Sequence, residues 1–416
     1  MIKDNSPQTS PQTSPQTSSQ AHTADTASSA PGALAGVRVL DMTSIGMGPF
    51  CTQTLGDYGA NVIKVEPAAG DVFRHASPSA APAMGAPFLQ FNRNKRSLVL
   101  NLKESGDLNI LLDLAKHADV LVFNVRPQAM RKLGLDYDSL SSLNPKLIYC
   151  GVYGYSEKGP YAGEPAYDDI IQAVGGLAWL QGSGDAPKFV TSIIADKIAG
   201  LTATHAILAA LYERTRSGQG QAIEVPMFET LVAFNMLEHM GEATLAKPNP
   251  QMGYPRAVSA HRRPYRTKDG YVALMPYTTG QWERFFELVG QPEIMQDQRF
   301  STPESRAQHT DELYSLLAEF VATKTTEQWL VLLKQADIPS GPVNSLNDLL
   351  DNEHLAAQEF FQHFHHPELG VMVIPKSPVS LSRTPTTVRR LAPRLGQHSE
   401  QVKQNGWSDN VGSGDT

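Results

Sequence analysis

Residues 36–65 read GVRVLDMTSIGMGPFCTQTLGDYGANVIKV, and this stretch predicts the fold of the chain. The apolar, β-branched run at 36–41 is typical of a strand. Pro49 suits the first turn of a helix, which should run to about Tyr58 and stop at Gly59. A second apolar run at 61–65 predicts another strand. Strand, helix and strand within about thirty residues form a βαβ unit with parallel strands.

The same alternation continues after this unit. Apolar strands that alternate with helices are typical of a layered α/β fold. The pattern predicts strands at 97–102, 120–123, 147–152 and 222–225, and helices at 106–118 and 196–216.

The length of 416 residues predicts more than one domain, because a single hydrophobic core stops growing at about 250–300 residues. Three copies of Pro-Gln-Thr-Ser and few apolar residues predict a disordered tail at the N-terminus. The alternation of strands and helices stops near residue 227. The motif Ile338-Pro-Ser-Gly-Pro-Val343 marks the point where the chain is expected to return to the large domain. We therefore expect a tail at 1–31, a large domain at 32–226, a small domain with a hairpin at 265–271 in 227–325, a return segment at 326–400 that completes the large domain, and a flexible C-terminus at 401–416.

The composition excludes several classes of protein. A net charge of −7 and the lack of a long basic run argue against nucleic-acid binding. No run approaches the ~18 apolar residues of a membrane span, and the N-terminus lacks the apolar core of a secretory signal. Cys51 and Cys150 lie in apolar surroundings and read as inert buried thiols, which fits a cytoplasmic location.

Common catalytic motifs are also missing from the sequence. There is no GxxxxGK[ST], HExxH or GxSxG. His363, His365 and His366 lack further ligands at a recognised spacing, so we expect a solvated loop and no metal site. The turn at 44–49 follows the first strand and opens a helix, a place that suits a nucleotide phosphate, although this pattern alone is weak.

Two adjacent carboxylates, Asp168 and Asp169, follow Tyr167 and precede an apolar run that ends in Gly175 and Gly176. An aspartate at this place is typical of a helix cap. An aspartate carboxylate is also ionised at neutral pH and is a nucleophile that needs no general base. Taken alone, the residues leave both interpretations open.

From about residue 32 to 398 the chain resembles the class III CoA-transferase family, which includes formyl-CoA transferase, carnitine CoA-transferase and the α-methylacyl-CoA racemases. Each block is weak alone, but their order along nearly the whole folded chain is specific. The blocks lie at 34–41, 48–49, 59–66, 92–97, 118–124, 143–149, 154–155, 159–161, 165–168, 218–221, 341–343 and 392–398.

This resemblance implies that Asp168 is the nucleophile of an acyl-CoA:carboxylate CoA-transferase, whereas the role of Asp169 stays open. The family reaction proceeds through an aspartyl-acyl anhydride and an aspartyl-CoA thioester. Acyl-CoA is then a substrate, and no tightly bound cofactor is expected. We expect a donor such as succinyl-CoA or acetyl-CoA and a small carboxylic acid as acceptor, with a dicarboxylic acid as the leading choice. The implied fold is a Rossmann-like large α/β domain built from both chain ends plus a smaller α+β domain, in an interlocked homodimer.

The resemblance also implies a set of CoA contacts. Alternatives remain: a solvated turn for Lys95 and Arg96, and a strand-end cap for Asn124. The chain departs from formyl-CoA transferase, which has glutamine where Gly46 stands and lysine where Tyr153 stands. The implied CoA-binding residues are Ile45, Gly46, Lys95, Arg96, Asn124, Lys132 and Tyr153.

The predicted small domain carries a basic cluster at Arg256, His261, Arg262 and Arg263. We expect part of it to bind a carboxylate of the substrate; a solvated loop or a CoA-phosphate contact is the alternative. Two other functions are alternatives. A racemase of the family would need a histidine partner, and none lies between His117 and Asp168. A non-catalytic CoA-binding protein would not need the complete nucleophile segment.

Overall fold

The computed structural model describes residues 31–79, 81–182 and 186–408. Its largest sheet has six strands, all parallel, in the order β3-β2-β1-β4-β5-β6. The predicted α/β fold is therefore confirmed, and the chain changes direction across the sheet between β1 and β4. The strands are β1 (Arg38–Met42), β2 (Asn61–Glu66), β3 (Lys95–Val99), β4 (Val120–Phe123), β5 (Ile148–Tyr153) and β6 (Ala222–Pro226).

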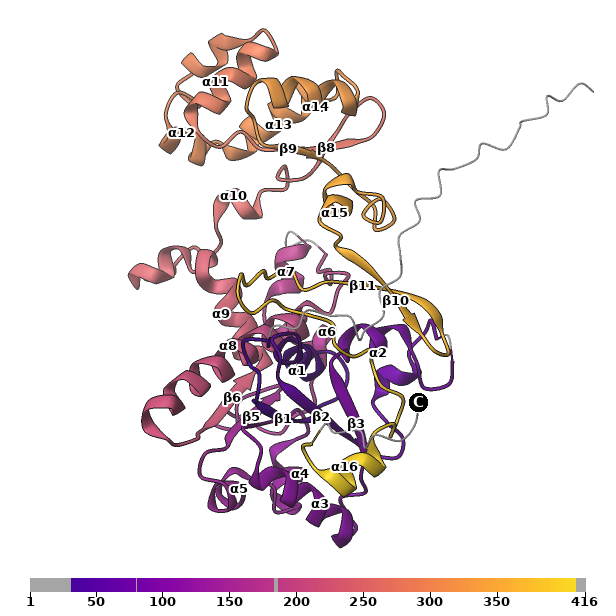
Figure 1. The fold of residues 1–416 in the computed structure, drawn as a ribbon. Coiled ribbons are helices and arrows are strands. Elements are labelled where there is room, and N and C mark those ends of the chain that lie inside the picture. The colour runs from indigo at the N-terminus through magenta and orange to yellow at the C-terminus, as the bar shows by residue number, and fades with distance from the viewer. Residues whose placement is uncertain (1–30, 80, 183–185, 409–416) are drawn as a thin grey trace, which may run out of the picture.

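Helices cover both faces of this sheet (Figure 1). Alternate strand residues such as Val39 and Leu40 enter two separate cores. One core is completed by α1 (Met47–Asp57) and α8 (Ile194–Ser217), and the other by α3 (Ser105–Lys116) with shorter helices. Further helices of this domain are η2 (Val72–His75), α2 (Ala86–Phe91), α4 (Pro127–Lys132), α5 (Tyr137–Leu143), α6 (Asp168–Val174), α7 (Leu177–Gln181) and α9 (Met227–His239).

Helix α8 is the one helix among the described residues that is long and apolar enough to cross a membrane by length and composition. A core helix has the same composition, and α8 packs against α1, α6, α9 and β5.

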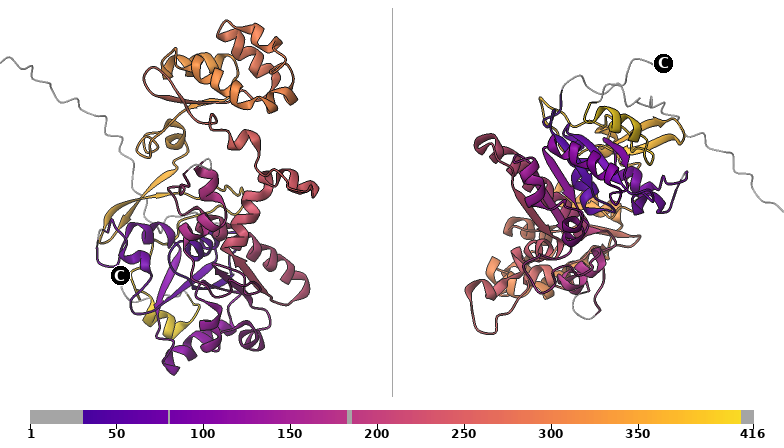
Figure 2. Two further views of the ribbon diagram at one scale, coloured as in Figure 1. Left: turned by 180° about the vertical axis from the view of Figure 1, so that it is seen from behind. Right: turned by 90° about the horizontal axis from the view of Figure 1, so that it is seen from below.

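The small domain stands apart from the large one and is joined to it by two connections (Figures 1 and 2). The predicted hairpin is confirmed: β7 and β8 pair antiparallel, and β9 extends them to three strands. Trp329 and Phe285 are fully buried in its separate core. Its elements are β7 (Tyr265–Arg266), β8 (Tyr271–Leu274), α11 (Thr279–Leu288), η4 (Pro292–Gln296), α12 (Pro303–Gln308), α13 (Thr310–Val321), α14 (Thr326–Gln335) and β9 (Ser340–Pro342).

The small core begins and ends later than the predicted range 227–325. Helix α9 packs against α6 and α8, and Leu231 belongs to the core of the large domain. The small core instead runs from Tyr265 to Ile338. The elements of the two connections are η3 (Gly241–Leu245), α10 (Pro255–Val258) and α15 (Glu353–Ala357).

The end of the chain returns to the large domain. Strands β10 (Phe361–His366) and β11 (Gly370–Pro375) form a hairpin, and α16 (Ser399–Asn405) packs against β3. The predicted flexible C-terminus is wrong up to residue 408, because Trp407 is buried and its indole N–H donates to Leu114 O at 3.0 Å. Residues 1–30 of the predicted tail, with the Pro-Gln-Thr-Ser repeats, and residues 409–416 lie outside the described residues.

Candidate active site

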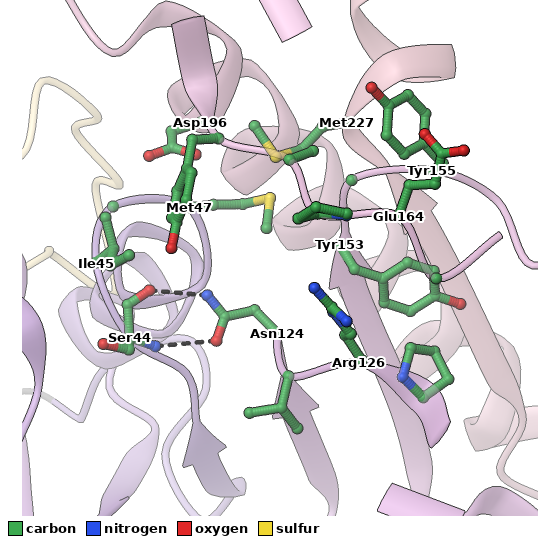
Figure 3. A pocket seen from close by; sticks show the side chains of 18 of the residues that line it. Ser44, Ile45, Met47, Asn124, Arg126, Tyr153, Tyr155, Glu164, Asp196 and Met227 are labelled. Carbon is green, nitrogen blue, oxygen red and sulfur yellow. Dashed lines mark hydrogen bonds between the residues drawn. The ribbon is translucent and has the colours of Figure 1, made fainter. Parts of the chain in front are cut away.

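A pocket of about 420 Å³ opens at the carboxyl ends of β1 and β4 (Figure 3). Ligands of open α/β sheets bind at such a point, where the strand order reverses. Its wall includes four of the residues predicted for CoA: Ile45 and Gly46 after β1, Asn124 after β4, and Tyr153 at the end of β5.

The turn after β1 is held from two sides. The Asn124 side chain accepts a hydrogen bond from Ser44 N at 3.0 Å and donates one to Ser44 O at 2.8 Å. Ile45 has φ +72°, a left-handed conformation that a β-branched residue adopts only under constraint. Asn124 therefore stabilises the wall of the pocket. The alternative predicted for Asn124 was a cap at the end of a strand, and its side-chain amide does bind the backbone that follows β1.

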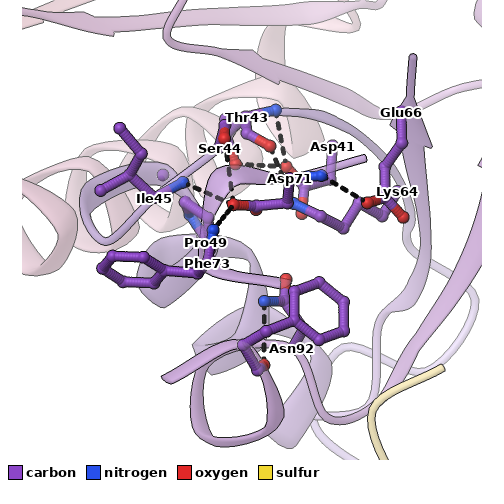
Figure 4. A network of polar contacts seen from close by, with 12 residues as sticks. Asp41, Thr43, Ser44, Ile45, Pro49, Lys64, Glu66, Asp71, Phe73 and Asn92 are labelled. Carbon is purple, nitrogen blue, oxygen red and sulfur yellow. Dashed lines mark hydrogen bonds and ion pairs between the residues drawn. The ribbon is translucent and has the colours of Figure 1, made fainter. Parts of the chain in front are cut away.

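A buried ionic network supports the same turn from below (Figure 4). Asp71 accepts hydrogen bonds from Ser44 Oγ and Ile45 N, each at 3.0 Å, and pairs with Lys64 Nζ at 2.8 Å. Burial opposes ionisation of Asp71, but Lys64 outweighs it and lowers the pKa of that carboxyl. Glu66 extends the network by binding Arg74 through both carboxylate oxygens, at 2.7 Å each.

Lys95 and Arg96 do not reach the pocket, which corrects their predicted contact with CoA phosphates. Lys95 is fully buried and its ammonium contacts the Asp41 carboxylate at 2.9 Å. Burial lowers the pKa of Lys95 to about 8. Arg96 is fully buried too and donates to Asn61 and to the backbone of Trp407. Both residues are structural parts of the large domain, and the solvated turn proposed as their alternative is also wrong.

Another cation lines the pocket in their place. Arg126, directly after β4, belongs to the pocket wall, and Lys132 at the end of α4 is exposed and does not. Sequence reasoning missed Arg126, although its position beside the predicted Asn124 was a usable signal. Tyr153 donates from its hydroxyl to Glu224 at 2.9 Å; burial and this carboxylate raise the pKa of the Tyr153 phenol.

Asp168 lies one layer behind this wall, in the first turn of α6, and is 7% exposed. Its Oδ1 accepts from Asp196 N at 2.9 Å and its Oδ2 accepts from Gln172 Nε2 at 2.6 Å. Tyr167 occupies the cap position, and no side chain caps the helix. The helix-cap interpretation of Asp168 is therefore wrong, because its carboxylate reaches across to α8. Gln172 is one helical turn after Asp168, a spacing that would have identified it.

Asp196, in the first turn of α8, is a second buried carboxyl group and belongs to the pocket wall (Figure 3). Burial, with the neighbouring Asp168, raises its pKa to about 7. A Cβ on Gly46 would lie 2.6 Å from Asp196 Oδ2, so glycine at 46 makes room for this carboxyl. Sequence reasoning missed Asp196, whose only signal was an acid at the start of a predicted helix.

The remaining predicted residues lie elsewhere. Asp169 is exposed, beside Asp168 but on the outside of α6. Arg262 and Arg263 line a separate hollow of about 400 Å³ in the small domain, and His261 precedes them. This hollow also borders β8 and β9, which Figure 1 draws in the small domain, away from α6, where Asp168 lies. Arg256 is held by the Tyr314 hydroxyl at 2.9 Å.

Metal ligands and reactive thiols do not gather near the site. Within the described residues, no group of three His, Cys, Asp or Glu side chains is placed to hold a metal. His366 accepts hydrogen bonds from the backbone N–H groups of Glu368 and Leu369. Cys51 and Cys150 are buried and unpaired, and burial raises the pKa of the Cys51 thiol to about 12.

Fold and pocket together define a doubly wound α/β protein with one buried carboxyl group in the pocket wall and a second one hydrogen-bonded to its backbone. The model of CoA-transferase family III matches residues 34–399, and the chain belongs to this family of class III CoA-transferases. It is 32% identical to succinyl-CoA:glutarate CoA-transferase of Mus musculus over 89% of this chain and 85% of that one. It is 33% identical to formyl-CoA:oxalate CoA-transferase of Streptomyces coelicolor over 89% and 94%. A CAIB/BAIF family protein from Brucella suis has a similar structure, with a TM-score of 0.76, 29% identity and coverage of 90% and 99%.

Proposed function

We propose that this CoA-transferase moves CoA from an acyl-CoA donor, such as succinyl-CoA, to a small dicarboxylic acid, with Asp168 as the nucleophile. One observation carries the proposal: both Asp168 oxygens accept a hydrogen bond from a fixed donor beside the ligand pocket. The named substrates of the relatives, glutarate and oxalate, are dicarboxylic acids and support the choice of acceptor.

The two donors suit the intermediates of this reaction. An Asp168 oxygen attacks the thioester carbonyl carbon, and the tetrahedral adduct expels CoA as a thiolate to leave an aspartyl-acyl mixed anhydride. The thiolate then attacks the aspartyl carbonyl carbon, which places negative charge on the aspartyl oxygen that formed no bond. That oxygen keeps its donor, either the Asp196 N–H or the Gln172 amide, so the charge meets a hydrogen bond already in place. The donor carboxylate departs and leaves Asp168 as a CoA thioester. The acceptor carboxylate attacks that thioester and expels the thiolate, which then attacks the acceptor acyl carbon and releases the Asp168 carboxylate.

The pocket offers chemistry that suits CoA. Helix α1 begins after Gly46 and directs its unpaired backbone N–H groups toward the end of β1, where an anion is favoured. Arg126 adds a permanent positive charge, which suits a phosphate. We therefore propose Ile45, Gly46, Asn124 and Arg126 as part of the CoA site.

We also propose a homodimer in which the small domain of one chain completes the site of the other. Large apolar side chains are exposed on α8 and α9, a surface that a second chain would cover. They are Leu201, Tyr212, Phe234 and Leu237. In such a dimer, Arg262 and Arg263 would bind the second carboxylate of the acceptor. A cytoplasmic location stays a prediction.

The first experiment incubates the enzyme with several acyl-CoA donors and a panel of mono- and dicarboxylic acids, and identifies new CoA esters by mass spectrometry. With one productive pair, hydroxylamine should trap an adduct on Asp168, and Asp168→Asn should abolish both adduct and transfer. Transfer that persists in Asp168→Asn would refute the assigned nucleophile.

The dimer is tested by complementation between two inactive variants. Asp168→Asn and the double variant Arg262→Ala/Arg263→Ala are co-expressed with different tags, and the mixed dimer is purified. One of its two sites then has both an intact large domain and an intact small domain, so about half of the wild-type activity should return. No recovery in a stable mixed dimer would contradict a site shared between chains.

A racemase has no support from the pocket. No histidine lies among its described lining residues, and proton transfer at the α-carbon would need a base opposite Asp168. Deuterium incorporation at the α-carbon of an acyl-CoA without transfer would favour that activity instead.

A further inference from the structure

The Asp196 carboxyl group is buried, faces the pocket and has no assigned task. It is 7% exposed, and no hydrogen bond reaches its side-chain oxygens from the described part of the chain, although its backbone N–H holds Asp168. This side chain borders the pocket, so a ligand there can supply the hydrogen-bond partner that the described residues do not.

Besides burial, the carboxylate of Asp168 is the charged group among the described residues that shifts the pKa of Asp196, and no cation offsets it. Helix α6 presents Asp168, whereas α1 carries no charged side chain before Asp57. Lys197, the next residue of α8, donates to Ser192 Oγ at 2.8 Å. The charged residues that line the pocket across from Asp196 are Arg126, Glu157 and Glu164.

Space is reserved for this carboxyl group. A Cβ on Gly46 would approach Asp196 Oδ2 to 2.6 Å and Ile193 Cδ1 to 2.8 Å. Asp196 therefore lies against the backbone at the start of α1, lines the pocket and is joined to Asp168 through its own backbone N–H.

We propose that Asp196 is a second catalytic residue, a neutral carboxylic acid whose O–H donates a hydrogen bond to the carbonyl oxygen of the acyl-CoA thioester. This inference rests on the proposed transferase activity. When an Asp168 oxygen bonds to the thioester carbon, the carbonyl π electrons move to oxygen, and Asp196 stabilises that oxyanion while keeping its proton. The electrons return as the C–S bond breaks, and CoA departs as a thiolate.

The protonation state of Asp196 agrees with this task. Burial and the charge of Asp168 raise its pKa to about 7, so its O–H is present below this pH and is lost as the pH rises. An ionised Asp196 would repel the oxyanion. Transfer should therefore decline above a pH of about 7.

Two variants separate a hydrogen-bond donor from a charge and from a structural role. Asp196→Asn keeps the size of the side chain and supplies an N–H donor that does not titrate. Asp196→Ala removes the donor. We measure kcat/KM for CoA transfer from pH 5.5 to 9, and the urea midpoint of each protein to verify folding.

Asp196→Ala should lower kcat/KM by about 100-fold, the usual effect of removing one oxyanion donor. Asp196→Asn should stay within about fivefold of wild type, and its profile should lack the decline near pH 7, since its amide donor does not ionise. Titration of the 3′-phosphate of CoA affects the pH profiles of wild type and variants equally, so it does not change the difference between them.

Three results would overturn the proposal. They are a loss in Asp196→Asn as large as that in Asp196→Ala, an unchanged decline near pH 7 in Asp196→Asn, and wild-type rates in Asp196→Ala. The failure of the proposed function looks different: wild-type enzyme would then transfer CoA between no tested pair and form no hydroxylamine-sensitive adduct on Asp168.

Discussion

Replacing Asn124 by alanine should loosen the turn that forms one wall of the pocket. The Asn124 side chain makes two hydrogen bonds to the Ser44 backbone, at 3.0 and 2.8 Å. At about 0.5–1.5 kcal/mol net for each bond, the free energy of unfolding should fall by about 2 kcal/mol. Asp71 still binds Ser44 Oγ and Ile45 N, so the turn should shift and the domain should stay folded.

The same change should weaken CoA binding. Ile45 has φ +72°, and such a conformation is unfavourable by about 1–3 kcal/mol, so the turn relaxes once half of its bonds are gone. A bias of about 1.4 kcal/mol against the turn that binds CoA raises the Kd about tenfold. Isothermal titration of the purified variant with CoA measures this change.

Asn144→Ala is the matched control for Asn124→Ala. The Asn144 amide donates to Ala115 O at 2.9 Å and Ala118 O at 2.8 Å, before the amino end of β4 and so at the opposite edge of the sheet. Asn144→Ala should destabilise the protein by a similar amount and leave the Kd for CoA unchanged. An equal loss of affinity in both variants, or none in Asn124→Ala, would refute the assigned role of the turn.

Three further substitutions test the site and its support. Gly46→Ala places a Cβ 2.6 Å from Asp196 Oδ2, so we expect about 1–3 kcal/mol less stability by urea unfolding and about tenfold lower kcat/KM. Asp71→Asn leaves the Lys64 ammonium buried without its 2.8 Å partner and should lower the free energy of unfolding by about 3–5 kcal/mol. Because the folded-state pKa of Asp71 is lowered, its contribution is present above pH ~4 and is lost as the pH falls, so urea midpoints of the variant should depend less on acid than those of wild type. Trp407→Ala empties a buried site beside α3 and should cost about 3–5 kcal/mol in the same assay.

Each of these substitutions has a control at an exposed place. A Cβ on Gly106 meets nothing within 4 Å, so Gly106→Ala should leave both stability and activity near wild type or raise stability slightly. Asp113 pairs with Lys116 in solvent, and Asp113→Asn should change stability by less than about 1 kcal/mol. Trp179 is 57% exposed, and Trp179→Ala should destabilise far less than Trp407→Ala. A control as damaging as its partner would contradict the structural reason given for that partner.

The sequence predicted best the central strands of the large sheet, which are continuous apolar runs. Residues 120–123 match β4, whose four apolar side chains are all buried. The edge strand β3 begins two residues before the predicted range, because it opens with the charged residues Lys95 and Arg96. The predicted boundary between the large and small domains, near residue 227, was too early. Helix α9 looks like its successors in sequence, and only packing against α8 assigns Leu231 to the large domain.

Charged residues were predicted less well, because the sequence does not indicate which distant residue will pair with a given charge. Lys95 and Arg96 resemble an exposed basic turn, but Asp41, which is 54 residues away, neutralises Lys95 in the interior. A buried ion pair between distant residues leaves no local pattern. Arg126 was overlooked although it lies two residues after Asn124, because its charge alone does not indicate that it belongs to the pocket wall.

Glycine at position 46, where formyl-CoA transferase has glutamine, leaves room for the Asp196 carboxyl group. In sequence, Gly46 was only the absence of the glutamine found in formyl-CoA transferase, and Asp196 was an acid favoured at a helix start. In the structure, the Asp196 carboxyl group fills the space that a Cβ at position 46 would need. Asp196 lies 28 residues after Asp168 in the sequence, and its backbone N–H donates a hydrogen bond to the Asp168 carboxylate. A side chain at position 46 would have to displace Asp196, so the two positions form one unit. If Asp196 carries the oxyanion contact, restoring glutamine at 46 should reduce kcat more than it changes the Kd for CoA, whereas a mere packing defect would change both alike.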